Sequence, residues 1–385
     1  MLIRDRVKHK PNRGGVVYIV TDPSSANIFG IHQILDLKAC NFTVHVICGQ
    51  GVLKKKINDN AITINIIPEL VREISVKKDL ISFFKIYLLL NRLKPLVVIY
   101  ATPKASLLGS VAGYFSKVPV RLYQIWGIRW ANLSSLKKYF LKQLDFLAIN
   151  LSTNVTSVSS SVAVEYNQYI NKHFEVLGKG STIGVSKDNF WFDKDDLKLT
   201  SPKTLGYIGR LSADKGISYL LEVFLILVKE FPDIILQIIG SEDISDEIDS
   251  SHRQLLATHP NIQCIGQLEQ DTIINYLKNW EFQLFLSQRE GLGNVILESA
   301  ACGVPSICWD IVGVRDAQPP VMADLLIPLG QTQLVVEKAV YLLKNPISLR
   351  EKISMSKWVM DNFNQDLVSL NFQEYIKKIV RKLSE

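Results

Sequence analysis

The sequence predicts an α/β fold in which two doubly wound, parallel-sheet domains face a central cleft. Three observations predict it: the chain has 385 residues, short apolar runs alternate with helical patterns, and a loop-rich stretch interrupts this alternation near the middle. One hydrophobic core seldom organises a chain of this length. Strands that alternate with helices are joined by right-handed crossovers and therefore form parallel sheets.

The first half of the chain keeps this alternation from its first apolar run onward. Apolar and β-branched runs predict strands at Val16–Thr21, Val44–Cys48, Ile62–Ile67, Leu96–Tyr100, Val120–Gln124 and Val155–Ser157. Helical spacing of apolar residues predicts helices at Ile28–Ala39, Leu80–Leu93 and Ser135–Ile149, with a further helix that begins near Thr102. This half therefore supplies one parallel sheet.

The stretch from Gly178 to Ser201 has the composition of an interdomain linker, because it combines glycines with the charged run Asp193–Lys198. Beyond it, strands are predicted at Leu205–Gly209, Ile234–Gly240, Ile262–Ile265, Phe282–Ser287 and Ser306–Asp310. Helices are predicted at Ile217–Phe231, Leu334–Leu343 and Leu349–Leu383. We expect Rossmann-like domains at residues 1–182 and 183–364, with a final helix at about 365–385 that packs back on the first domain.

Composition excludes several classes of protein. The chain is 47% hydrophobic and 21% charged, which is ordinary for a globular enzyme. One of its longest apolar runs, Ile81–Leu90, contains Lys85 and is shorter than the ~20 residues of a membrane-spanning helix. The first residues are basic and polar, so no secretory signal is expected. The five cysteines show neither disulfide nor metal spacing, which favours a cytoplasmic location with reduced thiols.

Positive charge is concentrated in the first half. Residues 1–196 hold 26 Lys and Arg against 14 Asp and Glu, or +12, whereas the remainder holds 18 against 23, or −5. A basic half favours contact with anionic lipid, an anionic acceptor or nucleic acid, and a solvated basic surface is the alternative. The segment Lys137–Lys142 mixes three lysines with Tyr139 and Phe140, which favours an anionic membrane surface. No nucleic-acid recognition module is visible, and the apolar side of Leu80–Leu93 is expected in the core.

No metal or bound cofactor is predicted. The six histidines show no ligand spacing. Asp193 and Asp195 form an Asp-x-Asp pair, but it lies in a polar linker without a flanking strand. No Walker sequence occurs, and no dinucleotide-binding glycine motif follows the first strand, which argues against ATP hydrolysis and NAD.

The first motif with chemistry in it is Gly206–Gly216, where a strand turns into a helix. Gly209 ends the strand, and Arg210 and Lys215 stand five residues apart in the turn. A helix start already favours negative charge; Arg binds phosphate oxygens bidentately and Lys adds a compact charge. The pair would stabilise a departing diphosphate in place of a metal ion. Surface residues with solvent partners are the alternative.

The second motif is Glu290–Glu298, which follows the strand Phe282–Ser287. Gly291 and Gly293 let the backbone approach a ligand, and a helix that starts near Asn294 offers N–H groups to an anion. Glu290 is expected at the loop mouth and Glu298 about two turns into the helix. Apolar neighbours predict that Glu298 is buried and needs partners, whereas an ordinary surface acid is the alternative. A site that binds an anionic group through backbone amides and hydroxyl groups through carboxylates fits a nucleotide sugar.

Together, Tyr207–Gly216 and Ser287–Pro305 resemble glycosyltransferase family 4, whose members are retaining, nucleotide-sugar-dependent enzymes with the two-domain GT-B fold. The resemblance covers nearly the whole chain. It implies that Arg210 and Lys215 hold the diphosphate, that Glu290 contacts the transferred sugar and that these three are the catalytic residues. It also implies that Glu298 binds the ribose hydroxyls. The donor-binding set that it implies is Gly209, Gly291, Gly293, Asn294, Val295 and Glu298.

The first half narrows the resemblance. Thr102–Gly109, Tyr123–Arg129 and Gly178–Gly184 look like the bacterial capsule, O-antigen and exopolysaccharide branch, whose members extend a sugar on an undecaprenyl-diphosphate carrier. That likeness makes Lys104 and Arg129 candidates to meet an acceptor phosphate, with solvated side chains as the alternative. Trp126 stands where relatives often have histidine near the sugar, so its indole either stacks on a sugar ring or packs in the protein.

Two further positions depart from the family pattern. The loop Asp22–Gly30 lacks the Gly-Gly that many relatives have there, and Ile183 stands where Asn often precedes Gly-Val. Both departures concern the acceptor-binding first half and its linker.

The resemblance implies a retaining, metal-independent transferase that moves a hexosyl or N-acetylhexosaminyl unit from a UDP-sugar to a lipid-linked glycan. Residues 1–182 would bind the acceptor and residues 183–364 the donor. The expected location is cytoplasmic, peripheral on the cytoplasmic face of the inner membrane. A nucleotide-sugar 2-epimerase and a non-catalytic subunit that binds nucleotide or glycan are the alternatives.

Overall fold

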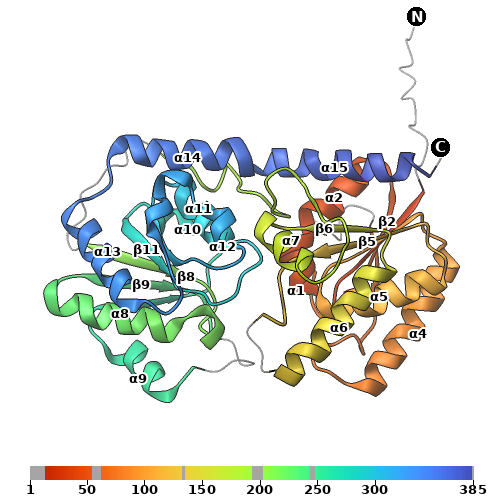
Figure 1. The fold of residues 1–385 in the computed structure, drawn as a ribbon, viewed down its shortest axis with the longest axis horizontal. Coiled ribbons are helices and arrows are strands. Elements are labelled where there is room, and N and C mark those ends of the chain that lie inside the picture. Colours follow the sequence, from red (N-terminus) through yellow and green to blue (C-terminus); the bar gives the residue numbers. More distant parts are fainter. Residues whose placement is uncertain (1–13, 54–61, 132–134, 193–202, 243–247, 384–385) are drawn as a thin grey trace, which may run out of the picture. The chain divides into compact units, whose positions relative to one another are not determined.

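The computed structural model describes residues 14–53, 62–131, 135–192, 203–242 and 248–383. The chain divides into two compact units, each built around its own parallel sheet (Figure 1). The first unit comprises residues 1–157, 172–177 and 369–385, and the second comprises 158–171 and 178–368. Two Rossmann-like α/β domains are therefore present, as the alternation of strands and helices predicted.

The first unit contains a seven-stranded sheet in the order β3-β2-β1-β4-β5-β6-β7, and every neighbouring pair is parallel. Its strands are β1 Gly15–Ile19, β2 Thr43–Cys48, β3 Thr63–Ile66, β4 Val97–Tyr100, β5 Val120–Ile125, β6 Asn154–Ser157 and β7 Glu175–Val176. Its helices are α1 Pro23–Ser25, the π-helical η1 Ala26–Gly30, α2 Ile31–Ala39, α4 Val76–Leu93, α5 Pro103–Phe115 and α6 Ser135–Leu151.

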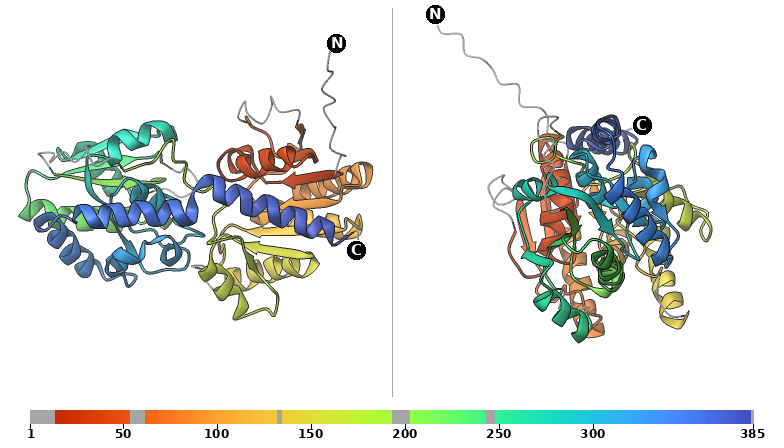
Figure 2. Two further views of the ribbon diagram at one scale, coloured as in Figure 1. Left: turned by 90° about the horizontal axis from the view of Figure 1, so that it is seen from above. Right: turned by 90° about the vertical axis from the view of Figure 1, so that its left-hand side faces the viewer.

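The last helix, α15 (Gln365–Arg381), begins in the second unit and packs on the first. Phe372 and Ile376 join the core cluster that includes Val16 of β1 and Val44 of β2. Asp36 of α2 accepts hydrogen bonds from Ser369 and from Gln373, the latter at 2.9 Å. Figure 1 shows the blue α15 along the top of this unit, and in the view from above in Figure 2 it lies in front of the unit's strands.

The second unit contains a six-stranded parallel sheet in the order β10-β9-β8-β11-β12-β13. Its strands are β8 Thr204–Ile208, β9 Ile235–Ile239, β10 Ile262–Gly266, β11 Trp280–Phe285, β12 Ser306–Trp309 and β13 Leu326–Ile327. Its helices are α7 Ser160–Asn167, η3 Ala213–Lys215, α8 Ile217–Glu230, α9 Ser250–Thr258, α10 Gln270–Leu277, α11 Asn294–Ala301, α12 Val314–Ala317, η4 Pro320–Leu325, α13 Thr332–Lys344 and α14 Leu349–Phe363.

Three details differ from the sequence-based expectations. The helix expected at Leu349–Leu383 is two helices, because Asn364 is extended (φ −54°, ψ 137°) between α14 and α15. Helix α4 starts at Val76, and only part of its apolar surface is in the core: Ile86 is buried, whereas Phe84 is exposed. The chain also crosses between the units more than once before the linker expected near 182/183: α7 belongs to the second unit, β7 returns to the first, and the chain enters the second unit again at 177/178.

The order of strands in the second sheet determines where a ligand can bind. Strands β8 and β11 are parallel neighbours at its centre, with Gly206 beside Gln283. From β8 the chain proceeds toward β9, whereas from β11 it proceeds to β12 on the other side. In open α/β sheets, ligands bind beyond the carboxyl ends of strands at such a reversal. Both motifs of the sequence analysis follow these two strands.

Candidate functional site

The loop after β8 carries Arg210 and Lys215, and its backbone is held in one conformation. The Tyr207 hydroxyl donates a hydrogen bond to the Arg210 carbonyl at 2.7 Å. The loop ends in the short helix η3 and then at Gly216, whose φ of +75° is unfavourable for other residues. A Cβ atom at Gly216 would lie 1.9 Å from the carbonyl oxygen of Leu286 in the loop after β11. Glycine here lets the two loops approach closely.

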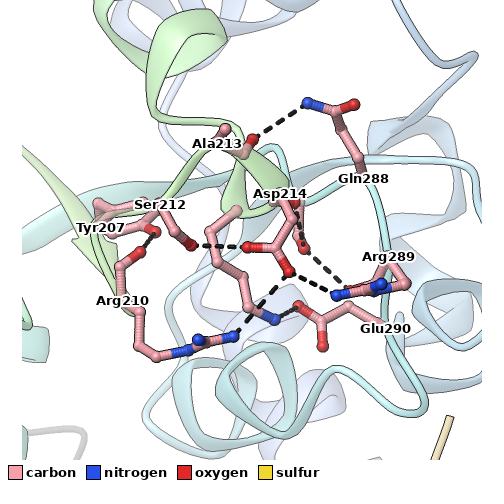
Figure 3. A network of polar contacts seen from close by, with 10 residues as sticks. Tyr207, Arg210, Ser212, Ala213, Asp214, Gln288, Arg289 and Glu290 are labelled. Carbon is pink, nitrogen blue, oxygen red and sulfur yellow. Dashed lines mark hydrogen bonds and ion pairs between the residues drawn. The ribbon is translucent and has the colours of Figure 1, made fainter. Parts of the chain in front are cut away.

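The carboxylate of Asp214 contacts polar side chains from the loop after β8 and from the loop after β11 (Figure 3). Its carboxylate accepts a hydrogen bond from the Ser212 hydroxyl at 2.6 Å and from Arg289 Nη2 at 3.1 Å, and Arg210 Nη2 lies 3.9 Å away. Burial alone would raise the pKa of Asp214, but the Ser212 hydrogen bond and the charges of Lys215, Arg289 and Arg210 lower it below its ordinary value. Asp214 therefore stays ionised and orients the cations around it.

Lys215 and Glu290 form an ion pair, with Nζ of Lys215 2.8 Å from Oε1 of Glu290. Their side chains are 19% and 13% exposed, so this pair is more than half withdrawn from solvent. The backbone N–H of Gln288 donates to the Asp214 carbonyl at 2.9 Å, which joins the two loops directly. The structure thus brings Arg210, Lys215 and Glu290 together, although the first two and the third come from different motifs.

Helix α11 begins at Asn294, where the sequence predicted a helix N-terminus. Gly293 is its N-cap residue, and no side chain caps the helix there. The Gly291 carbonyl accepts a hydrogen bond from the Ser159 hydroxyl at 2.7 Å, and Ser181 Oγ lies 3.4 Å from Asn294 Oδ1. The amides of Asn294 and Ile296 donate to the carbonyls of Leu292 and Gly293, both at 2.9 Å. The amide of Val295 lies in the first turn, before any helical carbonyl that it could bind, and is suited to an anion.

Glu298 lies about one turn into α11, not two. It is 5% exposed, and Gln270 Nε2 donates to its Oε1 at 3.1 Å. Burial raises the pKa of Glu298 to about 7, while the hydrogen bond from Gln270 opposes this rise. The Glu298 carboxyl group accepts this one hydrogen bond from Gln270 and can accept more. Two neighbouring hydroxyl groups of a ligand could donate them.

A set of contacts that the sequence did not predict fixes the loop between Glu290 and α11. Asp316 of α12 accepts hydrogen bonds from the backbone N–H groups of Ser160 and Ser161 at 3.1 and 3.2 Å, and from the Ser161 hydroxyl. The Gly313 N–H donates to the Ser161 hydroxyl at 2.7 Å. With the Ser159 bond to Gly291, the start of α7 holds the glycine loop. Three consecutive serines, Ser159–Ser161, which come one residue after β6 and include the start of α7, were the available signal.

The three candidates for the acceptor side belong to the first unit. Lys104 is 9% exposed, forms an ion pair with Asp79 at 2.6 Å and donates to the Glu73 carbonyl. Trp126 packs on Phe29, with ring centroids 5.3 Å apart, and within the described ranges its Nε1 has no hydrogen-bond partner.

The third candidate, Arg129, is exposed after β5. Of the two uses left open for Trp126, packing is thus observed. Lys104 is already engaged by protein groups.

Two searches cover only the residues that the structure describes. In that part of the chain no three His, Cys, Asp or Glu residues are grouped so that they could hold a metal ion. The pair Asp193 and Asp195 lies outside the described residues. No helix in the described ranges has the length and hydropathy that a bilayer span requires.

The fold and the converging loops define a glycosyltransferase of the GT-B architecture, and comparison with known proteins agrees. Residues 189–357 match the family model described as glycosyl transferases group 1, and residues 19–159 match that of glycosyl transferase 4-like proteins. The chain is 30% identical to the capsular polysaccharide biosynthesis glycosyltransferase CapM of Staphylococcus aureus over 347 residues, which covers 87% of this chain and 90% of CapM. The chain belongs to the group 1, family 4-like glycosyltransferases.

A more distant relative and two solved structures extend the comparison. The UDP-Gal:α-D-GlcNAc-diphosphoundecaprenol α-1,3-galactosyltransferase of Escherichia coli is 23% identical, with 71% of this chain and 72% of the relative covered. Sucrose-phosphate synthase of Thermosynechococcus elongatus shares the fold with a TM-score of 0.77 at 15% identity, over 96% and 99% of the two chains. HepE of Anabaena, solved with UDP-glucose, has a TM-score of 0.72 at 14% identity, over 95% and 100%.

Proposed function

We propose that this glycosyltransferase is a retaining enzyme that moves a hexosyl or N-acetylhexosaminyl unit from a UDP-sugar to a lipid-linked, undecaprenyl-diphosphate glycan during synthesis of a bacterial surface polysaccharide. The observation that carries the proposal is the convergence of Arg210, Lys215 and Glu290 around Asp214, next to the N-terminal end of the β11–α11 loop. The named roles of the two relatives, in capsule synthesis and on a diphosphoundecaprenol acceptor, support the pathway and the acceptor class.

Arg210 and Lys215 would stabilise the diphosphate as it leaves. Arg210 is half-exposed and Lys215 pairs with Glu290, so both place positive charge in the loop after β8, where a diphosphate would bind. The amides of Gly293 and Val295 would bind the same group at the start of α11, and that of Asn294 would first have to leave the Leu292 carbonyl. Together they stabilise negative charge as the sugar leaves, without a metal ion or other cofactor.

Glu290 and Glu298 would bind hydroxyl groups of the donor, Glu290 those of the transferred sugar and Glu298 those of the ribose. Glu290 already lies beside Lys215, so a donor whose diphosphate draws Lys215 away leaves Glu290 free to accept hydrogen bonds from hydroxyls of the transferred sugar. Glu298, buried against Gln270, would accept the two ribose hydroxyls. Those hydrogen bonds favour the ionised carboxylate, so donor binding near neutral pH should release a proton from a group whose pKa is about 7.

The reaction needs no separate protein base. The acceptor hydroxyl would attack from the face that the diphosphate leaves, and a diphosphate oxygen would take its proton, which retains the anomeric configuration. Arg129, which is exposed, and Lys104, which pairs with Asp79 in this structure, are the candidates for the acceptor phosphate. With a lipid-linked acceptor, the enzyme would work on the cytoplasmic face of the inner membrane.

The test is UDP release from a panel of UDP-sugars with a lipid-linked acceptor, in the wild type and in Arg210→Ala. Loss of one charge-stabilising donor should lower turnover by ~10²–10³-fold. Arg253→Ala is the matched control, since Arg253 is exposed on α9 and pairs with Glu242. Wild-type turnover by Arg210→Ala would refute the leaving-group assignment. An epimer formed from the donor alone would instead identify a 2-epimerase, and UDP binding without turnover of any sugar would identify a non-catalytic subunit.

A further inference from the structure

Helix α4 has an apolar stripe on the side opposite to its core-facing side. Val76, Leu80, Phe84 and Leu88 recur every four residues and are between 52% and 82% exposed. The core-facing positions Ser82, Ile86 and Leu90 lie on the other side of the helix and are buried. A helix at the surface of a water-soluble domain normally has polar residues on this outer side. This stripe therefore needs a partner other than water.

Helix α6 repeats the pattern. Leu136, Tyr139 and Phe140 are between 57% and 87% exposed, while Ala148 and Ile149 on the opposite side are buried. Nearby, Lys138 and Lys142 lie over the ring of Trp130, 6.0 and 4.9 Å from its centre, and Lys137 is exposed.

The two helices flank α5 in a single layer (Figure 1). Tyr114 and Phe115, at the end of α5, are exposed as well. We call the outer side of α4 and α6, with the end of α5, the α4–α6 face.

The α4–α6 face is also strongly basic. Helix α4 contains four cations and one acid, α5 one cation, and α6 three cations and one acid, which makes eight cations against two acids. That surplus of +6 compares with +7 for the whole chain. Two of the eight cations are paired with acids: Lys104, at the start of α5, with Asp79, and Lys85 with Glu69. Lys77, Lys78 and Arg92 of α4 are exposed beside the apolar stripe.

We propose that the α4–α6 face docks on an anionic bilayer surface, with the apolar side chains at the level of the acyl chains and the lysines and arginine at the lipid phosphates. Interfacial helices bind membranes by this combination of buried apolar area and basic residues. A second copy of this chain fits less well, because an isologous contact would place two faces of surplus positive charge against each other. Exposed Leu, Val and Phe would contribute little to a nucleic-acid complex, which depends on charge.

The position of the face connects it to the proposed function, on which this step rests. Helices α4, α5 and α6 follow β3, β4 and β5, so each starts at the carboxyl edge of the first sheet. Val76 and Leu80 of α4 and Leu136 of α6 lie in the first turns, hence near that edge. Ligands of parallel sheets bind at the carboxyl edge. A bilayer on this face would let a lipid-linked acceptor reach the first unit without leaving the membrane.

The test is co-sedimentation of the full-length protein with vesicles of equimolar phosphatidylcholine and phosphatidylglycerol, compared with vesicles of phosphatidylcholine alone. One variant carries Phe84→Gln and Leu88→Gln, and another carries Lys77→Gln, Lys78→Gln and Lys137→Gln. The matched control carries Tyr341→Gln and Leu370→Gln, which remove two exposed hydrophobic side chains from α13 and α15. Thermal stabilisation by UDP, measured for every variant, reports an intact donor side.

The wild type should bind the anionic vesicles, and binding should weaken as salt is raised. The lysine variant should bind about 100-fold more weakly, since each cation near the surface contributes about fivefold. The Phe84/Leu88 variant should lose about tenfold per side chain.

The control should bind like the wild type, and all variants should keep their response to UDP. Wild-type protein that ignores anionic vesicles, or variants that bind like the wild type, would overturn the proposal while leaving the donor site untouched. The proposal would also be overturned if the wild type self-associates but does not bind vesicles, and if the Phe84/Leu88 variant no longer self-associates. The partner of the α4–α6 face would then be a second copy of the chain.

Discussion

Replacement of Glu298 by glutamine should stabilise the ligand-free protein at alkaline pH while it weakens UDP binding. The structure buries this carboxyl group and raises its pKa from 4.5 to about 7. At 1.36 kcal/mol for each tenfold change in a protonation constant, this difference corresponds to about 3 kcal/mol. The ionised carboxylate therefore costs the folded, empty protein about 3 kcal/mol that a neutral amide of the same shape does not cost.

The pH dependence has a definite sign. Below 4.5, Glu298 is protonated in both the folded and the unfolded chain and has no effect. As pH rises from 4.5 to about 7, the unfolded chain loses the proton first, so the folded state holds more protons and stability falls. Above about 7 the full cost is present. The gain in stability from Glu298→Gln should accordingly be larger at about pH 8 than at about pH 5, by about 2–3 kcal/mol.

Thermal unfolding at the two pH values, without nucleotide, measures this effect. A domain of this size shifts by about 2–4 °C per kcal/mol, so the second unit should melt about 5–10 °C higher in the variant, relative to its shift at the lower pH. Glu222→Gln, on the exposed side of α8, is the control and should show no such pH dependence.

The same variant should bind UDP about tenfold more weakly or worse, because a neutral amide is a poorer acceptor for ribose hydroxyls. Equal shifts at both pH values, or unchanged UDP affinity, would refute the assignment of Glu298 as a buried, ligand-binding acid.

Three further substitutions test the rest of the site. Lys215→Met should lower turnover by ~10²–10³-fold in a UDP-release assay, and unchanged turnover would remove this lysine from the leaving-group site. Gly216→Ala should lower the free energy of unfolding by more than ~2 kcal/mol in chemical denaturation, since its Cβ would lie 1.9 Å from the Leu286 carbonyl oxygen; an unchanged midpoint would contradict the close approach of the loops. Asp316→Ala should cost about 1–2 kcal/mol and raise KM for the UDP-sugar, because it frees the start of α7 from α12, and Ser159 at that start binds the Gly291 carbonyl. Initial rates at varied donor concentration measure the KM effect, and a wild-type KM would show that the loop is held by other contacts.

Much of the fold was predictable because its signal is local. Every strand that the apolar runs predicted, from Val16–Thr21 to Ser306–Asp310, is present with small shifts at its ends. Fully buried parallel strands give continuous apolar runs, and these survive in the sequence whatever packs on them. Strand β7, with two residues, and helix α12, with four, are too short to leave such a signal.

The candidate site was predictable where glycine, charge and a strand end coincide. Arg210, Lys215 and Glu290 follow β8 and β11, and the parallel pairing of these strands brings them together. Asp214 was visible in the same motif, but its role as the group that orients Arg289 and Arg210 depends on distances that no spacing encodes. Lys104 was a candidate for the acceptor phosphate, with a solvated side chain as the alternative, and its pairing with Asp79 is a long-range contact that the sequence did not reveal.

The sequence by itself determined the α/β class, the repeated sheet and the chemical character of the two loops, because hydrophobic periodicity and backbone-permissive glycines act over a few residues. Only the tertiary structure decided which residues those loops meet. The assignment of α7 to the second unit, the contact of Asp316 with its first turn and the outward side of α4 all depend on long-range packing. The sequence of α4 shows that two sides of this helix are apolar. It does not show which of the two sides the rest of the chain covers.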